Sequence, residues 1–296
     1  MLRLCLLLLP AVILLEAAEK VRVASYNVRN YLVCDRMVDG RWRPEYPKPE
    51  KEKKALRAII SKANADVLAL QEMGGPTFLR ELWSDLNASG GPKYPYALLW
   101  PGLNPEEERH LALFSRLPFV KVKRQADLEF NYFDEVKIPD RGLLEVEFET
   151  NGVKWRLFNL HLKSKWTERK DDPEGAIRRE KEARAIRDYV RKTYLPESKP
   201  NHLIVGDFND YKKTSPLKRF MTVNGRHLAD AVPCADSRGQ RWTHHYAKQD
   251  VYSRVDFILV SPAMSSRIVP DSGVVQDGPQ ALVASDHRLV QADFEF

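Results

Sequence analysis

The sequence predicts a layered α/β fold, and three observations lead to this prediction. Short, mostly apolar stretches with the character of buried strands recur along the chain, whereas only a few stretches have helical periodicity. Several expected strands follow one another through short turns, which favours packed layers over a repeating βαβ barrel. The expected strands are Val21–Val28, Asp66–Gln71, Tyr96–Trp100, Leu111–Ser115, Leu143–Thr150, Val153–Leu162, His202–Gly206, Val255–Val260 and Leu289–Phe296.

One strand carries a strict alternation. In Leu143–Thr150, apolar Leu144, Val146 and Phe148 alternate with three glutamates. Since successive side chains of a strand point to opposite faces, this pattern predicts one buried face and one face in contact with water.

Three helices are expected. In Pro49–Ala65 an apolar stripe that includes Leu56 and Ile60 runs among lysines, and Glu174–Tyr194 has a looser stripe. A third helix, Thr77–Leu86, starts from a Gly-Gly-Pro turn. The arginine-rich run 178–191 is interpreted as a solvated helix face without a functional role.

The first residues predict export. Arg3 precedes the apolar run Leu4–Leu15, and small residues follow, as in a secretory signal peptide. The run is short for a membrane span, although an uncleaved anchor is an alternative. We therefore expect a signal peptide at 1–18, one domain at 19–296, and a secreted or periplasmic protein that acts as a monomer.

Charge and cysteines leave alternatives open. Lys and Arg outnumber Asp and Glu by 47 to 41, so the formal net charge is +6. Such a balance favours anionic partners such as nucleic acid or phospholipid head groups, but it fits simple solubility equally well. Outside the leader, Cys34 and Cys234 could form a disulfide in an oxidising compartment or remain two thiols.

The strongest signal is a set of polar residues at the ends of the expected strands. Alone, each has an ordinary interpretation as a turn former, a loop acid or a core histidine; together, they indicate one shared site, because burying each separately would be costly. Carboxylate and amide oxygens suit Mg²⁺, with Mn²⁺ or Ca²⁺ as alternatives, and phosphoester cleavage needs a metal, a base for water and donors for the developing charge. The set is Asn27, Glu72, His161, Asp207, Asn209, Asp256, Asp286 and His287.

The order of these motifs resembles a known family. The blocks Ser-Tyr-Asn-Val, Leu-Gln-Glu, Ser-Arg-Leu-Pro, Asn-Leu-His-Leu-Lys-Ser, Gly-Asp-Phe-Asn-Asp, Val-Asp-Phe-Ile-Leu and Ser-Asp-His resemble the endonuclease/exonuclease/phosphatase superfamily, which includes the DNase I-like enzymes. The resemblance implies a four-layer α/β sandwich of two packed mixed sheets flanked by helices. It also implies a metal-dependent phosphoester hydrolase with its site at one edge of the sheets.

The resemblance also implies roles for the site residues. Glu72 would be the main metal ligand, with Asn27 and Asp286 nearby, while Asp207 and Asn209 would orient or deprotonate water and hold the phosphate. His161 and His287 would contact the scissile phosphate, with Asp256 orienting His287. Glu108 resembles the glutamate that pairs with the other catalytic histidine, here His161, and Arg141 resembles a phosphate-contacting arginine. A zinc site at His244 and His245 is not favoured, because no third ligand is suitably spaced.

Several substrates are compatible with this site. The segment from His161 to Trp166 resembles that of bacterial extracellular nucleases, and Lys163, Lys165 and Trp166 could hold phosphates and stack on a base. A nuclease is therefore the first hypothesis. A phospholipid or sphingomyelin phosphodiesterase is the second, with an aromatic loop of Phe130, Tyr132 and Phe133 touching membrane lipid; a small-molecule phosphatase is the third. A catalytically inactive binding module is a remote alternative.

Overall fold

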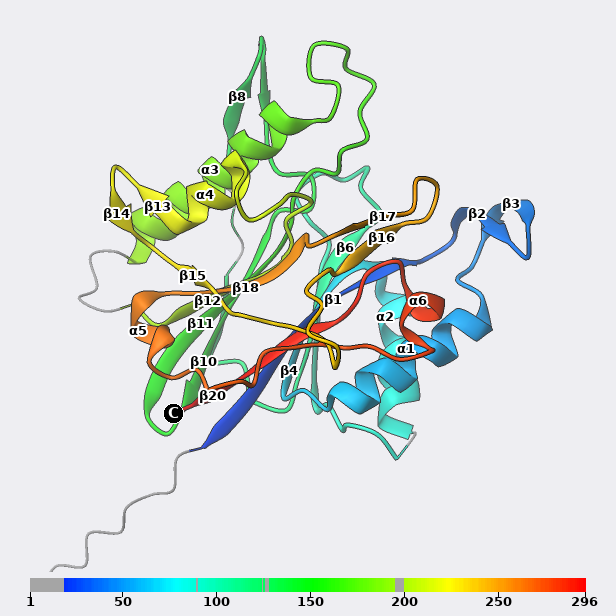
Figure 1. Ribbon diagram of the computed structural model, residues 1–296, viewed down its shortest axis with the longest axis horizontal. Coiled ribbons are helices and arrows are strands. Elements are labelled where there is room, and N and C mark those ends of the chain that lie inside the picture. Colours follow the sequence, from blue (N-terminus) through cyan, green and yellow to red (C-terminus); the bar gives the residue numbers. More distant parts are fainter. Residues whose placement is uncertain (1–18, 89, 124, 126–127, 195–199) are drawn as a thin grey trace, which may run out of the picture.

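Two six-stranded mixed β-sheets form the centre of the protein (Figure 1). The computed structural model describes residues 19–88, 90–123, 125, 128–194 and 200–296. In order across the first sheet lie β19 (Val274–Val275), β20 (Val290–Glu295), β1 (Lys20–Tyr31), β4 (Val67–Met73), β6 (His110–Ser115) and β5 (Tyr96–Trp100). In order across the second lie β15 (Asp230–Ala231), β18 (Asp256–Val260), β12 (His202–Asp207), β11 (Val153–His161), β10 (Leu143–Thr150) and β7 (Lys121–Lys123).

Helices cover the outer face of each sheet, which gives the expected four layers (Figure 1). Helices α1 (Glu50–Ala63), α2 (Pro76–Ala88) and α6 (Ala281–Ala284) pack on the first sheet in one hydrophobic cluster. Helices α3 (Ala176–Tyr194) and α4 (Ser215–Met221) pack on the second sheet in another cluster, and α5 (Pro262–Ser265) follows β18. A third cluster fills the space between the sheets. The predicted sandwich is confirmed.

Four two-stranded hairpins were not expected from the sequence. They are β2 (Cys34–Val38) with β3 (Arg41–Tyr46), β8 (Phe130–Tyr132) with β9 (Glu135–Lys137), β13 (Thr222–Val223) with β14 (Arg226–His227), and β16 (His244–Tyr246) with β17 (Val251–Ser253). Most of their residues are exposed or half-buried, so they lack the apolar pattern that marks the central strands.

A buried amide bridge joins the two sheets close to the polar edge. Nε2 of Gln71 on β4 donates to Oδ1 of Asn159 on β11 over 2.7 Å. Nδ2 of Asn159 in turn donates to the carbonyl oxygens of Leu70 and Ala112 in the first sheet. Because buried amides are costly unless paired, this bridge fixes how the two sheets lie against one another.

Two expectations about charged faces were wrong. Glu145 was expected on a wet face of β10, but it is 2% exposed and accepts hydrogen bonds from Gln125 and from the hydroxyls of Tyr189 and Tyr194. The arginine-rich face of α3 was expected to be solvated, but Arg179 is 1% exposed. Its Nε donates to Oδ2 of Asp210 over 2.9 Å, so this arginine ties the helix to the loop after β12.

The remaining predictions about the chain have mixed outcomes. Cys34 and Cys234 are both free thiols, so the alternative of a disulfide is not realised. The expected signal peptide at 1–18 lies outside the described residues. Among the helices of the described chain, none is both long and apolar enough to cross a membrane.

Candidate active site

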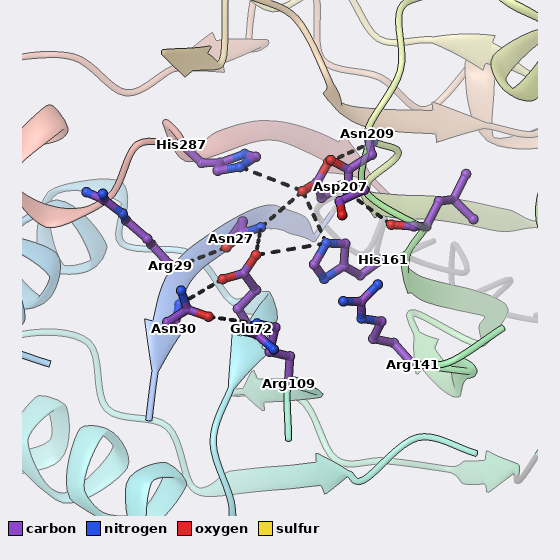
Figure 2. A network of polar contacts seen from close by, with 12 residues as sticks. Asn27, Arg29, Asn30, Glu72, Arg109, Arg141, His161, Asp207, Asn209 and His287 are labelled. Atoms are coloured by element: carbon purple, nitrogen blue, oxygen red, sulfur yellow. Dashed lines mark hydrogen bonds and ion pairs between the residues drawn. The ribbon is translucent and has the colours of Figure 1, made fainter. Parts of the chain in front are cut away.

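The predicted polar residues meet at one edge of the two sheets, where parallel strands end. β1 and β4 are parallel neighbours, and so are β11 and β12. In the register of the second sheet, His161 is opposite Asp207, and Asp207 is opposite Asp256 at the start of antiparallel β18. Because carboxyl ends of parallel strands lie together, residues far apart in sequence are placed side by side (Figure 2).

Glycine is required immediately before Asp207. A Cβ atom on Gly206 would lie 1.9 Å from the carbonyl oxygen of Leu160, and its φ of 139° disfavours other residues. The Gly-Asp pair of the motif therefore reflects a close approach of β12 to β11, which brings the Asp207 carboxyl into the site.

The strands of the first sheet are irregular at the site. The register between β1 and β4 shifts between Asn27 and Tyr31, and that between β4 and β6 shifts between Leu70 and Met73. Glu72, within the second irregularity, has a φ of 62°, and Asn209 after β12 has a φ of 51°. Left-handed conformations of non-glycine residues cost energy and concentrate at functional sites, and here they redirect side chains to one edge.

Asp207 lies at the centre of the cluster (Figure 2). Its Oδ2 accepts a hydrogen bond from Nδ2 of Asn27 over 3.0 Å and lies 3.4 Å from Nε2 of His161 and 3.7 Å from Nε2 of His287. Its Oδ1 accepts the backbone N–H of Asn209 over 2.8 Å. Burial raises the pKa of Asp207 to about 7, although His287 acts in the opposite direction. A carboxyl with such a pKa can accept a proton from water near neutral pH.

His287 is held as a charged group. Its Nδ1 lies 2.9 Å from Oδ2 of Asp256, and its backbone N–H donates to the hydroxyl of Ser285 over 3.0 Å. Burial alone would lower its pKa, but Asp256 and Asp207 outweigh burial and raise the pKa well above the ordinary value. The predicted orientation of His287 by Asp256 is present in the structure.

His161 has the opposite character. Burial, together with the positive charge of Arg141, holds its pKa well below the ordinary value, so this imidazole is neutral. The prediction that Glu108 pairs with His161 was wrong. Glu108 is exposed, and Nδ1 of His161 is buried without a hydrogen-bond partner in the described part of the chain.

The adjacent glutamate, Glu107, has the structural role instead. Its Oε2 lies 2.8 Å from Nη2 of Arg141, and its Oε1 lies 3.4 Å from Nη1 of Arg109. Nε of Arg109 donates to Oδ1 of Asn30, whose backbone N–H donates to Glu72. These contacts join the predicted metal ligand to the predicted phosphate-binding arginine, and Figure 2 shows the part from Glu72 through Asn30 to Arg109.

Arg141 is suited to bind an anion. It is buried next to His161, and its Nε and Nη1 atoms have no hydrogen-bond partner within the described ranges. The guanidinium is held by Glu107 through Nη2, and its unused Nε and Nη1 donors leave a buried positive charge that an anion such as a phosphate group would satisfy.

The predicted metal ligands lie near one another, but they differ in which side-chain atoms are available to a cation. The Glu72 carboxylate is partly exposed: Oε1 accepts from Nδ2 of Asn27 over 3.1 Å and Oε2 accepts from the backbone of Asn30. The Asn27 oxygen accepts the backbone N–H of Arg29, so Asn27 offers its nitrogen rather than an oxygen to the site. Asp286 is half-buried and lies 3.3 Å from Nε of Arg29.

A divalent cation fits the carboxylates better than the imidazole. Within the described residues, the one group of three donors within 4.8 Å of one another is Asp207, Asp256 and His287. Because the pKa of His287 is raised, its ring is an imidazolium and a poor cation ligand. Glu72, which shares the Asn27 amide with Asp207, supplies hard oxygen atoms of the kind that Mg²⁺ prefers.

Two histidines that were interpreted as loop residues begin β16. The ring of His244 lies 4.6 Å from that of His287, centre to centre, and that of His245 stacks on Tyr252 at 4.2 Å. His244 is therefore a site residue that the sequence did not indicate. Its packing depends on the β16–β17 hairpin, for which the sequence carries no periodic signal.

Lys163 and Asn209 lie beside the central cluster. The backbone N–H of Lys163 donates to buried Glu182 over 2.7 Å, and its side chain reaches the carbonyl oxygen of Trp166. Nδ2 of Asn209 donates to the carbonyl oxygen of Leu162 over 2.9 Å. The Glu182 contact fixes the segment that follows β11 to α3, and the Asn209 contact fixes it to the end of β12.

Comparisons with known proteins agree with this arrangement. A family model described as the Endonuclease/Exonuclease/phosphatase family matches residues 24–287. The chain belongs to the endonuclease/exonuclease/phosphatase family. It is therefore a phosphoester hydrolase by family, as the sequence motifs predicted. Among curated proteins, none matches the chain significantly.

Solved structures from this family share the fold. The human Nocturnin catalytic domain with bound sulfate is 18% identical, with a TM-score of 0.63, and the alignment covers 94% of this chain and 97% of that one. A Staphylococcus aureus beta toxin mutant with bound magnesium ions is 18% identical, with a TM-score of 0.62 and coverages of 93% and 99%. Sphingomyelinase C from Streptomyces griseocarneus is 15% identical, with a TM-score of 0.62 and coverages of 93% and 99%. At these identities the likeness concerns the fold alone.

Proposed function

We propose that the protein is a secreted, metal-dependent phosphodiesterase whose substrate is nucleic acid. The observation that carries this proposal is a rim of exposed aromatic rings and lysines beside the catalytic cluster. Trp166 is 71% exposed and Tyr211 40% exposed. The ammonium of Lys163 lies 5.7 Å from the Trp166 ring centre, and that of Lys165 lies 4.7 Å from the Tyr211 ring centre.

This rim suits a single strand of nucleic acid. Exposed aromatic rings stack on bases, and adjacent lysines attract backbone phosphates without selecting a sequence. Lys163 follows His161 by two residues and Tyr211 follows Asn209 by two, so a strand lying over the rim would pass the catalytic edge.

The site residues support a hydrolytic mechanism. Asp207 would take the proton of the attacking water, since burial raises its pKa to about 7. Arg141 and charged His287 would hold the phosphate oxygens and stabilise the charge that develops on them. His161, kept neutral by burial, would donate a hydrogen bond from Nε2 without adding charge. Glu72, whose carboxylate is partly exposed, would hold a divalent cation, which would supply positive charge at the phosphate.

Localisation and assembly are part of the proposal. The basic, apolar and small-residue pattern of residues 1–18 supports a cleaved leader and export to the periplasm or the medium. The catalytic residues named above all come from one chain, which supports a monomer as the active unit.

A lipid phosphodiesterase is the second candidate, and one observation favours it. Phe133 at the turn of the β8–β9 hairpin is 44% exposed, and the Arg169 guanidinium lies 4.2 Å from its ring centre. An exposed aromatic ring beside a cation is suited to a lipid surface. The rest of the expected aromatic loop contributes less, because Tyr132 is buried and donates its hydroxyl to Asp172.

Two substrates and two matched variants distinguish the candidates. Nicking of circular single-stranded DNA and hydrolysis of sphingomyelin vesicles would be measured with Mg²⁺ or EDTA for wild type, Trp166→Ala/Tyr211→Ala and Phe133→Ala. Because base stacking contributes about 1–3 kcal/mol per base, nicking should fall roughly tenfold or more in the double variant and stay unchanged in Phe133→Ala. Metal-dependent sphingomyelin hydrolysis without nicking, lost in Phe133→Ala, would contradict a nuclease.

A further inference from the structure

A cavity lies away from the catalytic edge. It has a volume of about 590 Å³, and His202 and Ile204 from the beginning of β12 line it. β12 ends at Asp207, three residues after Ile204, so about 10 Å of strand separates the nearest β12 residue of the cavity from the catalytic residue. A volume of this size is typical of sites for small organic ligands.

The cavity is strongly basic. Arg187 and Arg191 from α3, Arg226 from β14 and Arg267 after α5 line it, and no Asp or Glu is among its described lining residues. Arg187 is buried, and Nε of Arg191 is buried without a hydrogen-bond partner in the described residues.

One carboxylate on α3 is shared among three arginines next to the cavity. Oδ1 of Asp188 lies 2.7 Å from Nη2 of Arg187 and 3.3 Å from Nη1 of Arg191, and its Oδ2 lies 4.0 Å from Nε of Arg184. A single negative charge cannot balance the four arginines that line the cavity, so among the described residues the cavity carries excess positive charge. An anion held between the arginines would remove this imbalance and would satisfy Nε of Arg191.

Part of the cavity wall is apolar and aromatic, and it includes residues of α3 next to the arginines. Val190, Tyr194, Ile204 and Phe220 line the cavity, and burial lowers the pKa of the neighbouring His202 to about 4, which leaves that imidazole neutral. A small inorganic anion would leave this wall without contacts. The geometry therefore fits a ligand that has both an anionic group and an apolar or aromatic body.

We propose that this cavity is a binding site for a small organic phosphate, with the phosphate on the arginines of α3 and β14 and an aromatic body on the Phe220 side. The guanidinium fork matches phosphate oxygens, and arginine binds them more specifically than lysine does. A mononucleotide has this chemistry. The ligand could come from the free pool or from the terminal phosphate of a nucleic acid, and the site is independent of the reaction proposed above.

Calorimetric titration with AMP, adenosine and inorganic phosphate tests the proposal. Wild type would be compared with Arg191→Gln/Arg226→Gln, both in EDTA. Arg226 is exposed and the Arg191 side chain is 38% exposed, so these changes should leave the fold intact, which a thermal melt would check. AMP should bind more tightly than either fragment, and its affinity should fall roughly tenfold or more in the double variant, since charge-assisted hydrogen bonds are lost.

Two controls assign the binding to this cavity. Arg184→Gln removes another α3 arginine near Asp188 that does not line the cavity, and AMP affinity should be unchanged. Arg141→Gln removes the phosphate donor of the catalytic site and should also leave this AMP binding intact. Loss of AMP binding in Arg141→Gln but not in the double variant would overturn the proposal, as would absence of AMP binding to wild type.

A short single-stranded oligonucleotide distinguishes the two sources of the phosphate. A 5′-phosphorylated oligonucleotide that competes with AMP, where its unphosphorylated form does not, would indicate a nucleic acid end as the ligand. AMP binding that neither oligonucleotide displaces would indicate a free organic phosphate. Both results support a phosphate site at the cavity, and both can be obtained whether or not the protein cleaves nucleic acid.

Discussion

Substituting Asp256 by Asn should disable catalysis while the protein stays folded. Oδ2 of Asp256 lies 2.9 Å from Nδ1 of His287, and both residues are buried. At an effective dielectric constant of about 20, opposite charges at that separation interact by about 6 kcal/mol. The asparagine amide keeps a neutral hydrogen bond of about 1 kcal/mol, and Asp207 still supports part of the His287 charge. We therefore expect a loss of about 4 kcal/mol in transition-state stabilisation, or roughly 10³-fold in kcat/KM.

The assay is hydrolysis of a chromogenic phosphodiester with saturating Mg²⁺, and the control is Asp293→Asn. Asp293 is buried and forms a bidentate pair with Arg22 at 2.7 and 3.0 Å, away from the catalytic edge. That variant should lose stability but keep kcat, because its ion pair does not contact the catalytic residues. A folded Asp256→Asn variant with kcat/KM within threefold of wild type would refute the role assigned to His287.

Three further predictions follow from single contacts. Glu107→Gln should lower kcat/KM roughly tenfold or more because Arg141 loses its anchor, whereas Glu108→Gln should have little effect; equal effects of the two would contradict the assignment. Burial lowers the pKa of His202 from about 6.5 unfolded to about 4 folded. The free energy of unfolding therefore carries the full contribution of neutral His202 above pH 6.5 and loses up to about 3 kcal/mol of it as the pH drops to 4. Urea unfolding of His202→Asn should lack this pH-dependent loss. A pH dependence of stability equal to that of wild type would contradict the prediction. Arg179→Met should lower the free energy of unfolding by about 3 kcal/mol or more, because Asp210 is left buried and unpaired. A decrease in the free energy of unfolding of less than about 1 kcal/mol would show that this ion pair is dispensable.

The central residues of the site could be predicted because each one ends a strand with a clear apolar pattern. Asp207 and His161 follow buried parallel strands, and the chemistry of the side chains indicates a shared function. Asp256 instead begins β18 and His287 precedes β20, so they reach the same edge from the starts of strands, and their contact at 2.9 Å agrees with the sequence-based role.

The pairing of Glu107 rather than Glu108 could not be predicted. Both lie in a segment without regular secondary structure, so no periodicity indicates which side chain points inward. The same reason explains His244, whose place against His287 depends on a short hairpin that the apolar pattern does not mark.

The burial of certain charged side chains also could not be predicted from the sequence. Glu145 lies on a strand face that alternation predicts to be wet, but the end of α3 and its tyrosines cover that face. Arg179 lies in an arginine-rich helix face, and its burial depends on the tertiary contact with Asp210. The local sequence pattern indicates which residues share one face of a strand or helix. Which neighbouring element covers that face depends on the packing of segments that are distant in the sequence.

The most direct test of the central claim is hydrolysis of bis-p-nitrophenyl phosphate by wild type and Asp207→Asn, each with Mg²⁺ and with EDTA. Asp207 is the carboxyl on which both imidazoles and the Asn27 amide converge, so the claim depends on it. We predict that wild type releases p-nitrophenol only with the metal present and that Asp207→Asn is slower by roughly 10³-fold or more. Hydrolysis that persists in EDTA, or a folded Asp207→Asn variant as active as wild type, would contradict the account.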